Sequence, residues 1–273
     1  MMLVKLTWLA GLLATVAAQD IERCGTAEPE MEDLALAADL AKEARLLPRY
    51  EPVPIVIPTY FHLLAVNETI EGGWVSDDVL KVQLDVLNAD FGPHNISFEL
   101  KEINRLVHVP WSQNRDVANM KRTLRRGAYD SLNVYYQQYV SGNLGYCTYP
   151  RNYAPGSTGF FNDGCNVLTD SLPGGPLPRF ALGKTATHEV GHWMDLFHTF
   201  QNGCSCVGDM VHDTPASKDP SWGCQIGRNS CPDFPGLDPV TNYMDYSDDP
   251  CFEEFSEGQA WRMRAAWWTL RAQ

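Results

Sequence analysis

The chain has no apolar run long enough to cross a bilayer. The run at residues 6–14 is far shorter than the roughly 20 residues that a transmembrane helix needs, and no other stretch approaches that length. Basic residues are scarce: 21 Lys and Arg face 34 Asp and Glu, which leaves a net charge of -13. Such a charge repels phosphate backbones and anionic lipid, and so argues against nucleic acids and membrane surfaces as partners. No internal repeat or low-complexity tract is visible, and 273 residues with 44% apolar content can bury the core of one or two domains.

The first 18 residues differ in character from the rest of the chain. Lys5 supplies a short positive region, residues 6–14 are nearly all apolar, and the small residues 16–18 offer a cleavage site before Gln19. This pattern predicts a signal peptide over residues 1–18 and a secreted product. The alternative is a buried N-terminal helix.

Two further features agree with secretion into the extracellular space. All eight cysteines lie beyond residue 18, as expected of a disulfide-bonded extracellular protein. Asn67 and Asn95 begin the triplets Asn-Glu-Thr and Asn-Ile-Ser, which are acceptors for N-glycosylation. Such triplets are common by chance, so they add only weak support.

Residues 19–49 form a charged stretch with helical composition around residues 31–44 and little that could build a core of its own. The stretch ends in a proline-bearing linker. We interpret it as a pro-segment that precedes a catalytic domain over residues 50–273.

The catalytic domain begins with alternating strand and helix patterns. Residues 53–66, 96–100 and 132–136 have the β-branched or alternating sequences of strands. A helix capped by Ser76 is predicted after the first strand, and a second helix covers residues 116–126. The apolar face of the first helix consists of Leu80, Leu84, Leu87 and Phe91. This β-α-β-α-β order favours an α/β layer built on a mostly parallel sheet.

The composition changes beyond Cys204. Gly, Pro, Asp and Cys dominate as far as Cys251, which predicts a loop-rich region held by disulfides. Ser256 and Gln259 have the spacing of a capping box, so a last helix is expected to start there.

The motif that carries the chemistry is His188-Glu189-Val190-Gly191-His192. On a helix, residues four apart lie on one face with Cβ atoms about 5–6 Å apart, so the two imidazoles can bind one zinc ion. Glu189 would act as the general base on a water molecule. His198 strengthens this interpretation. A straight helix could not bring it to the same ion, so the chain must turn back before it, as in the metzincin spacing of three histidines.

These residues resemble the pappalysin branch of the metzincin zinc peptidases, particularly its secreted microbial and fungal members. The likeness covers most of the chain after about Pro52. It includes residues 87–91, 172–175, 208–209, 213–215, 236–239 and 242–246. The resemblance implies a metzincin-like fold of α/β (α+β) class, with a twisted mixed sheet and helices in the N-terminal subdomain, an active-site helix, and a loop-rich, disulfide-stapled C-terminal subdomain ending in a helix.

The resemblance also assigns roles after the third histidine. Met244 occupies the Met-turn, a loop that places a thioether beneath the zinc ligands without binding the metal. Tyr246 lies where related enzymes have a tyrosine that can contact the metal or the developing oxyanion. One position departs from the pattern: the family has Gly at the turn, and this chain has Asp195. Asp tolerates positive φ at some cost, so the turn is expected to survive, with Asp195 as an alternative acidic ligand.

The resemblance further implies the disulfides Cys204–Cys231 and Cys224–Cys251, whereas four cysteines alone allow three connectivities. Cys147 and Cys165 could clip a hairpin-like excursion before the active-site helix. The tetrapeptide Arg23-Cys24-Gly25-Thr26 resembles the cysteine switch of family proenzymes, in which Cys24 would bind zinc in place of water. The alternative is a Cys24–Cys206 disulfide, which would use all eight cysteines.

The leading hypothesis is a secreted zymogen of a zinc endopeptidase. We expect it to be a monomer and to act on proteins or peptides that lie extended along the sheet edge. Two alternatives remain open: a catalytically weak binding protein in which Asp195 distorts the site, and a zinc amidase for small substrates. Asp209 and Asp213 could bind calcium or form a solvated acidic loop. The remaining histidines are expected to be surface or hydrogen-bonded structural residues: His62, His94, His108 and His212.

Overall fold

The computed structural model of the chain describes residues 21–44 and 53–272. The expected signal peptide, residues 1–18, lies outside this part, as do residues 45–52. The helices and strands that build the molecule are, in chain order, α1 (Met31–Ala44), β1 (Ile55–Ala65), α2 (Asp77–Phe91), β2 (Ile96–Val107), α3 (Val109–Ser112), α4 (Val117–Leu124), β3 (Leu132–Gln137), β4 (Gly145–Cys147), α5 (Thr158–Asn162), β5 (Cys165–Leu168), α6 (Lys184–Trp193) and α7 (Glu257–Ala266). None of the described helices is both long and apolar enough to span a membrane.

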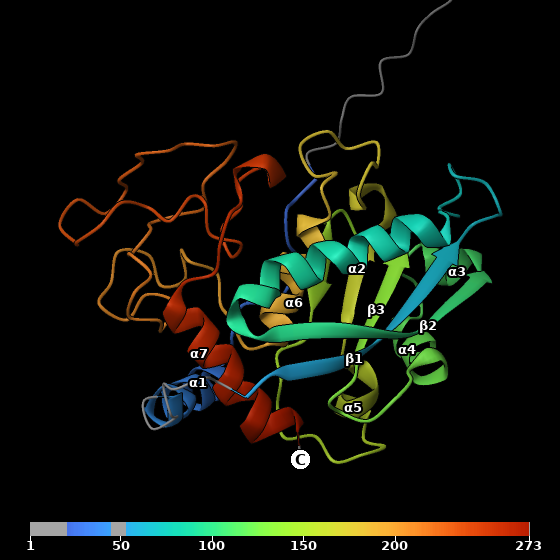
Figure 1. Cartoon of the computed structure of the whole chain (residues 1–273), viewed down its shortest axis with the longest axis horizontal. Coiled ribbons are helices and arrows are strands. Elements are labelled where there is room, and N and C mark those ends of the chain that lie inside the picture. Colours follow the sequence, from blue (N-terminus) through green and yellow to red (C-terminus); the bar gives the residue numbers. More distant parts are fainter. Residues whose placement is uncertain (1–20, 45–52, 273) are drawn as a thin grey trace, which may run out of the picture.

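A five-stranded sheet in the order β2-β1-β3-β5-β4 forms the centre of the molecule (Figure 1). Strand β1 pairs in parallel with both β2 and β3, and β3 pairs in parallel with β5. Strand β4 alone runs antiparallel to its neighbour and lies at the edge. The predicted mixed α/β class with a mostly parallel sheet is therefore confirmed.

Helices cover both faces of this sheet. Along β3, Leu132, Val134 and Tyr136 belong to the main core cluster that also holds the apolar side chains of α2 and α6. Tyr135, between them in sequence, points to the opposite face and packs with residues of α3 and α4. This alternation follows from the period of two in a strand. It places α2 and α6 side by side on one face.

Helix α2 shows why the local sequence folds as predicted. The Ser76 side chain accepts a hydrogen bond from the Val79 N–H, and Asp77 and Asp78 lie in the first turn, where negative charge is favourable. Leu80, Leu87 and Phe91 are fully buried against the sheet.

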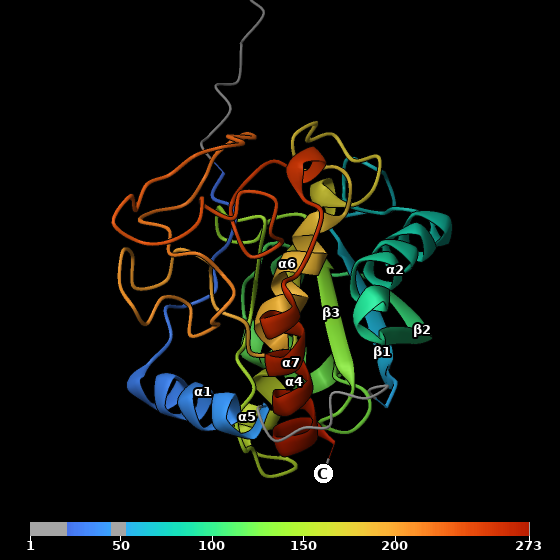
Figure 2. The same cartoon turned by 60° about the vertical axis from the view of Figure 1, so that its left-hand side comes forward.

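The region after α6 contains few regular elements, and it forms the orange loops in Figures 1 and 2. Disulfides join Cys204 to Cys231 and Cys224 to Cys251, and a third joins Cys147 to Cys165 across the β4–β5 pair. These are the pairs named above. The region ends in α7, whose capping box is formed by Ser256 and Gln259 as expected.

Candidate active site

Helix α6 brings the first two histidines together. It starts after Gly183, which adopts a left-handed φ of 80°, and ends at Trp193. His188 and His192 are four residues apart and fully buried, and their Nε2 atoms lie 3.2 Å from each other.

A tight turn after α6 returns the chain so that a third histidine faces the same point. Asp195 has a φ of 76°, and its N–H donates to the His192 carbonyl, while the Leu196 N–H donates to that of Gly191. The turn brings His198 Nε2 to 3.1 Å from His192 Nε2. The Asp195 carboxylate points elsewhere and accepts a hydrogen bond of 3.0 Å from Arg262 Nε. Asp195 is thus not part of the histidine cluster.

The orientation of the imidazoles is set by backbone carbonyls. His188 Nδ1 donates to the Tyr243 carbonyl, and His192 Nδ1 donates to that of Leu196, each at 2.7 Å. Since a carbonyl can only accept, these Nδ1 atoms carry the protons and the Nε2 lone pairs point inward. Burial lowers the pKa of His188 well below its usual value and that of His192 to about 4, which keeps both rings neutral. Three converging neutral nitrogens fit a divalent metal ion of zinc type, because their lone pairs would otherwise repel.

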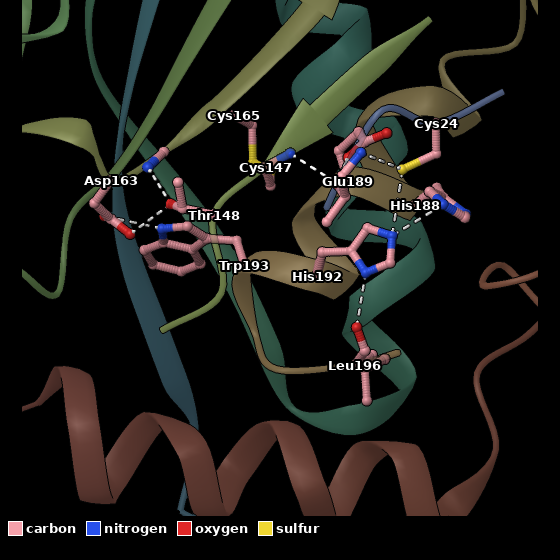
Figure 3. Close-up of a disulfide and its surroundings, with 12 residues drawn as sticks. Cys24, Cys147, Thr148, Asp163, Cys165, His188, Glu189, His192, Trp193 and Leu196 are labelled. Atoms are coloured by element: carbon pink, nitrogen blue, oxygen red, sulfur yellow. Dashed lines mark hydrogen bonds between the residues drawn. A yellow bond between two sulfur atoms is a disulfide. The ribbon is translucent and has the colours of Figure 1, made fainter. Parts of the chain in front are cut away.

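Cys24 completes the cluster. Its side chain points toward His192 (Figure 3), with the Sγ atom 3.5 Å from His192 Nε2. The ligand atoms of Cys24, His188, His192 and His198 all lie within 4.8 Å of one another. Cys24 is buried and unpaired, whereas Cys206 is exposed and also unpaired. The alternative of a Cys24–Cys206 disulfide is therefore wrong.

Glu189 lies next to the cluster. It is fully buried, its Oε2 accepts a hydrogen bond of 2.9 Å from Thr26 Oγ1, and burial raises its pKa to about 8. Gly145 on the edge strand makes room for it, since a Cβ atom there would lie 2.7 Å from Glu189 Cγ. A buried carboxyl of this pKa beside a metal position can exchange protons near neutral pH.

The Met-turn segment packs beneath the histidines. A Cβ atom at Gly191 would overlap Met244 Sδ, so the glycine inside the histidine motif allows this close approach. Met244 is fully buried. The Tyr246 ring lies 5.0 Å from the His198 ring, and its hydroxyl donates to the Cys24 carbonyl at 3.4 Å. Burial raises the pKa of Tyr246, so this hydroxyl stays protonated and can donate.

The segment around Cys24 runs along the free edge of β4. The Gly25 N–H donates to the Gly145 carbonyl at 2.7 Å, and Glu22 forms a parallel bridge with Asn143. Cys147 N–H donates to Thr26 Oγ1. Residues 22–26 therefore occupy the edge of the sheet directly above α6.

Arg23 extends from this segment to a buried position beside one carboxylate and two phenyl rings. Its Nη1 atom lies 2.7 Å from Asp249 Oδ1, and both side chains are fully buried. The guanidinium carbon lies 5.1 Å from the centre of the Phe180 ring and 4.8 Å from that of Phe252. The two nitrogens Nε and Nη2 of Arg23 have no hydrogen-bond partner.

Sequence reasoning missed the roles of Thr26, Arg23 and Asp249. Thr26 and Arg23 lie in the tetrapeptide whose cysteine carries the resemblance, and the basic residue beside Cys24 is a signal for an acidic partner. Nothing local marked Asp249 as that partner, because it lies 226 residues away in sequence.

The two acids considered as calcium ligands, Asp209 and Asp213, form hydrogen bonds within the fold. Asp209 is buried and accepts from Val211 N–H and Thr214 Oγ1, so the expectation of a solvated acidic loop is wrong for it. Asp213 accepts from Ser256 Oγ and Gly258 N–H at the start of α7. These hydrogen bonds give both acids a role in holding the surrounding loops and the start of α7.

The remaining histidines and the sequons lie away from the cluster. His62 is buried on β1 and bonded to Asn133, and His108 caps α3. Asn67 and Asn95 are exposed, which leaves both accessible to glycosylation.

Comparisons with known proteins agree with this geometry. Residues 126–267 match the model of the peptidase M43 family, described as pregnancy-associated plasma protein-A. An extracellular metalloprotease of Verticillium alfalfae is 54% identical over 98% of both chains, and extracellular metalloprotease 1 of Coccidioides posadasii is 51% identical over 80% of this chain and 79% of its own.

Two solved structures of known proteins are similar in fold to this chain. Mature mirolysin of Tannerella forsythia, in complex with a cleaved peptide, has a TM-score of 0.65 at 27% identity and covers 78% of this chain and 91% of its own. A promirolysin mutant of the same organism shares the fold, with a TM-score of 0.72 at 24% identity over 92% of this chain and 95% of its own.

Proposed function

Since the chain belongs to the peptidase M43 family, the pappalysin branch of the metzincins, we propose that it hydrolyses peptide bonds at one zinc ion held by His188, His192 and His198. The chain is an extracellular metalloendopeptidase, and we infer that it is secreted as a zymogen. The observation that carries the proposal is the convergence of three Nε2 lone pairs beside the buried carboxyl of Glu189.

The chain supplies groups on both sides of the metal position. When bound, zinc supplies Lewis acidity, which lowers the pKa of a coordinated water to about 7 and polarises a carbonyl. Glu189 accepts the proton of the attacking water and passes it to the leaving amine. The Tyr246 hydroxyl, held protonated by burial, donates a hydrogen bond to the oxyanion that forms on the substrate carbonyl.

Residues 19–49 would act as a pro-segment that blocks this machinery at three points. Cys24 Sγ would hold the metal together with the three histidines, Thr26 Oγ1 donates a hydrogen bond to the general base Glu189, and Gly25 N–H donates to the Gly145 carbonyl on the sheet edge. Burial and the Glu189 carboxylate raise the pKa of the Cys24 thiol, so a cation is needed to hold it as thiolate. Removal of the segment frees the edge of β4 for an extended substrate.

The pocket that holds Arg23 supports a preference for basic side chains beside the scissile bond. Once the pro-segment leaves, the Asp249 carboxylate stays in place, still accepting from the Leu182 N–H at 2.9 Å, and the rings of Phe180 and Phe252 that packed on the Arg23 guanidinium remain beside the vacated position. An unpaired buried carboxylate is costly, so a substrate Arg or Lys that enters the pocket would bind favourably.

The test compares the activated enzyme with its Glu189→Gln variant on casein. We expect the variant to bind zinc with the same stoichiometry and to lose about 10²–10⁴-fold in kcat. A chelator should abolish cleavage by the wild type, and added zinc should restore it. Glu99→Gln, an exposed acid on β2, is the matched control and should keep full activity.

Three results would contradict the proposal in different ways. Full activity of Glu189→Gln would exclude Glu189 as the general base. A zinc-loaded but inert wild type would favour the binding protein, and cleavage of small amides without proteins would favour the amidase.

A further inference from the structure

Helix α1 packs on the body of the molecule alongside α7 (Figures 1 and 2), and none of its residues belongs to the metal cluster. Its buried positions Asp33, Ala37 and Leu40 are four and three residues apart and form one stripe. The other residues at positions 31–42 are partly or fully exposed. Helix α1 is therefore an amphipathic helix that lies on a surface rather than inside a core.

The surface beneath α1 is apolar and belongs to the catalytic domain. Leu36 and Leu40 pack against α7, and Leu34 and Ala37 pack against the region between β4 and the third histidine. We call this surface the helix-docking surface; it consists of Tyr149, Phe197, Ala265, Ala266 and Leu270.

A cation at the rim of the helix-docking surface matches the acidic start of α1. Arg151 lies 2.8 Å from Asp33, 3.0 Å from Glu30 and 3.5 Å from Glu32. The acidic residues also suit the positive end of the helix dipole. The surface therefore combines a complementary charge with an apolar stripe, which sets both the place and the direction of the bound helix.

We propose that the helix-docking surface remains a binding site of the mature enzyme, and that its ligand is an acidic amphipathic helix, in the first place the excised α1 itself. This inference rests on the proposed removal of residues 19–49. Removal of α1 would uncover the apolar side chains together, and such patches mark interaction sites. Cleavage of the chain after α1 breaks none of the contacts described above.

The pro-segment then binds through two separate parts. Residues 22–26 bind at the metal cluster and the sheet edge, and α1 binds at the helix-docking surface. Because both parts belong to one short peptide, binding of one raises the effective concentration of the other. The excised segment should therefore inhibit the mature enzyme in trans far better than its metal-binding part alone.

The test uses mature enzyme and synthetic peptides, with hydrolysis of a short peptide substrate as the readout. We expect the peptide of residues 21–44 to inhibit at least tenfold more strongly than that of residues 21–27. The peptide variant Leu36→Asp/Leu40→Asp should fall back to the level of residues 21–27. The matched control Met31→Asp/Ala35→Asp changes exposed positions of the same helix and should keep most of the inhibition.

A variant of the enzyme provides the complementary test. Arg151→Glu should weaken inhibition by residues 21–44 severalfold and leave inhibition by residues 21–27 unchanged. Equal inhibition by the long and short peptides, or equal loss in both double variants, would overturn the inference.

Failure of the proposed latency gives a different result. If neither peptide inhibits, a labelled peptide of residues 28–44, which lacks Cys24, still reports on the surface by fluorescence anisotropy. Binding that Leu36→Asp/Leu40→Asp removes supports the helix-docking surface on its own. Absence of binding overturns it.

Discussion

The half of the molecule from β1 to α6 and the loop-rich half, residues 199–256, are held together by different interactions. The first half has a continuous apolar core between the sheet, α2 and α6. The second half contributes only Tyr243, Met244, Phe252 and Phe255 to that core. The rest of it is held by two disulfides and by buried carboxylates that accept backbone N–H groups, such as Asp245 from Ser221 and Asp238 from Ser230. Periodic patterns build the first half, and individual long-range contacts build the second.

The cluster of histidines lies where these two halves meet. The spacing along α6 sets His188 and His192, whereas His198 depends on a turn whose Asp195 is tied to α7. Substitutions that change the turn or its link to α7, but leave α6 unchanged, test this difference between the two halves most directly.

The largest expected effect is at the buried pair Asp195–Arg262, whose side chains are 1% and 2% exposed. Arg262→Met leaves the Asp195 carboxylate without its partner and should lower the free energy of unfolding by about 3–5 kcal/mol. Asp195→Gly leaves Arg262 unpaired but removes about 1–2 kcal/mol of left-handed strain. The double variant buries neither charge and should lie within about 2 kcal/mol of wild type, measured by urea unfolding.

The double variant shows whether the turn at Asp195 and helix α7 are energetically coupled through this pair. If the losses of the two single variants add in the double variant, the pair does not couple the turn to α7. Lys81→Met, which breaks an exposed pair with Asp78 on α2, is the control and should change stability by less than about 0.5 kcal/mol.

The same division explains what could be predicted from the sequence. The cap Ser76, the buried face of α2 and the approach of His188 and His192 follow from local spacing, so they were predictable. The presence of β4 and β5 was not, because each is only three or four residues long and lacks a pattern. The role of Asp249 could not be predicted, since its partner Arg23 lies 226 residues away in sequence. Asp209 bonds to nearby residues, Val211 and Thr214, but its burial comes from the tertiary fold and no local pattern marks it.

The second prediction compares one disulfide from each half. Replacing Cys204 and Cys231 by Ala, or Cys147 and Cys165 by Ala, should cost about 3 kcal/mol in either case, because loops with sequence separations of 27 and 18 differ little in closure entropy. The local consequences should differ. Hydrogen exchange should speed up throughout residues 204–231 in the first variant, whereas β5 should stay protected in the second by its pairing with β3.

Loss of protection in β5 equal to that in residues 204–231 would contradict this contrast. It would mean that the sheet edge depends on its disulfide as much as the loops do.

The smallest expected effect is a pH dependence of opposite sign in the two halves. Burial lowers the pKa of His62 on β1 to about 4, and burial raises the pKa of Asp209 in the loops to about 7. Between pH 4 and 6.5 the unfolded state binds more protons at His62, so this residue makes the protein less stable as the pH falls. Between pH 4 and 7 the folded state binds more protons at Asp209, so that residue makes the protein less stable as the pH rises.

Two variants isolate these contributions. His62→Gln can still donate to Asn133, and Asp209→Asn can still accept from Val211 and Thr214. Urea unfolding at pH 5 and pH 7 gives the change in the free energy of unfolding between the two conditions. We compare the change in the free energy of unfolding from pH 7 to pH 5 with that of wild type. This change should be about 2 kcal/mol more positive in His62→Gln, which lacks the group that destabilises the fold at low pH. It should be about 2 kcal/mol more negative in Asp209→Asn, which lacks the group that stabilises the fold at low pH. Shifts of the same sign in both variants would show that the two halves do not bury their ionisable groups in opposite ways.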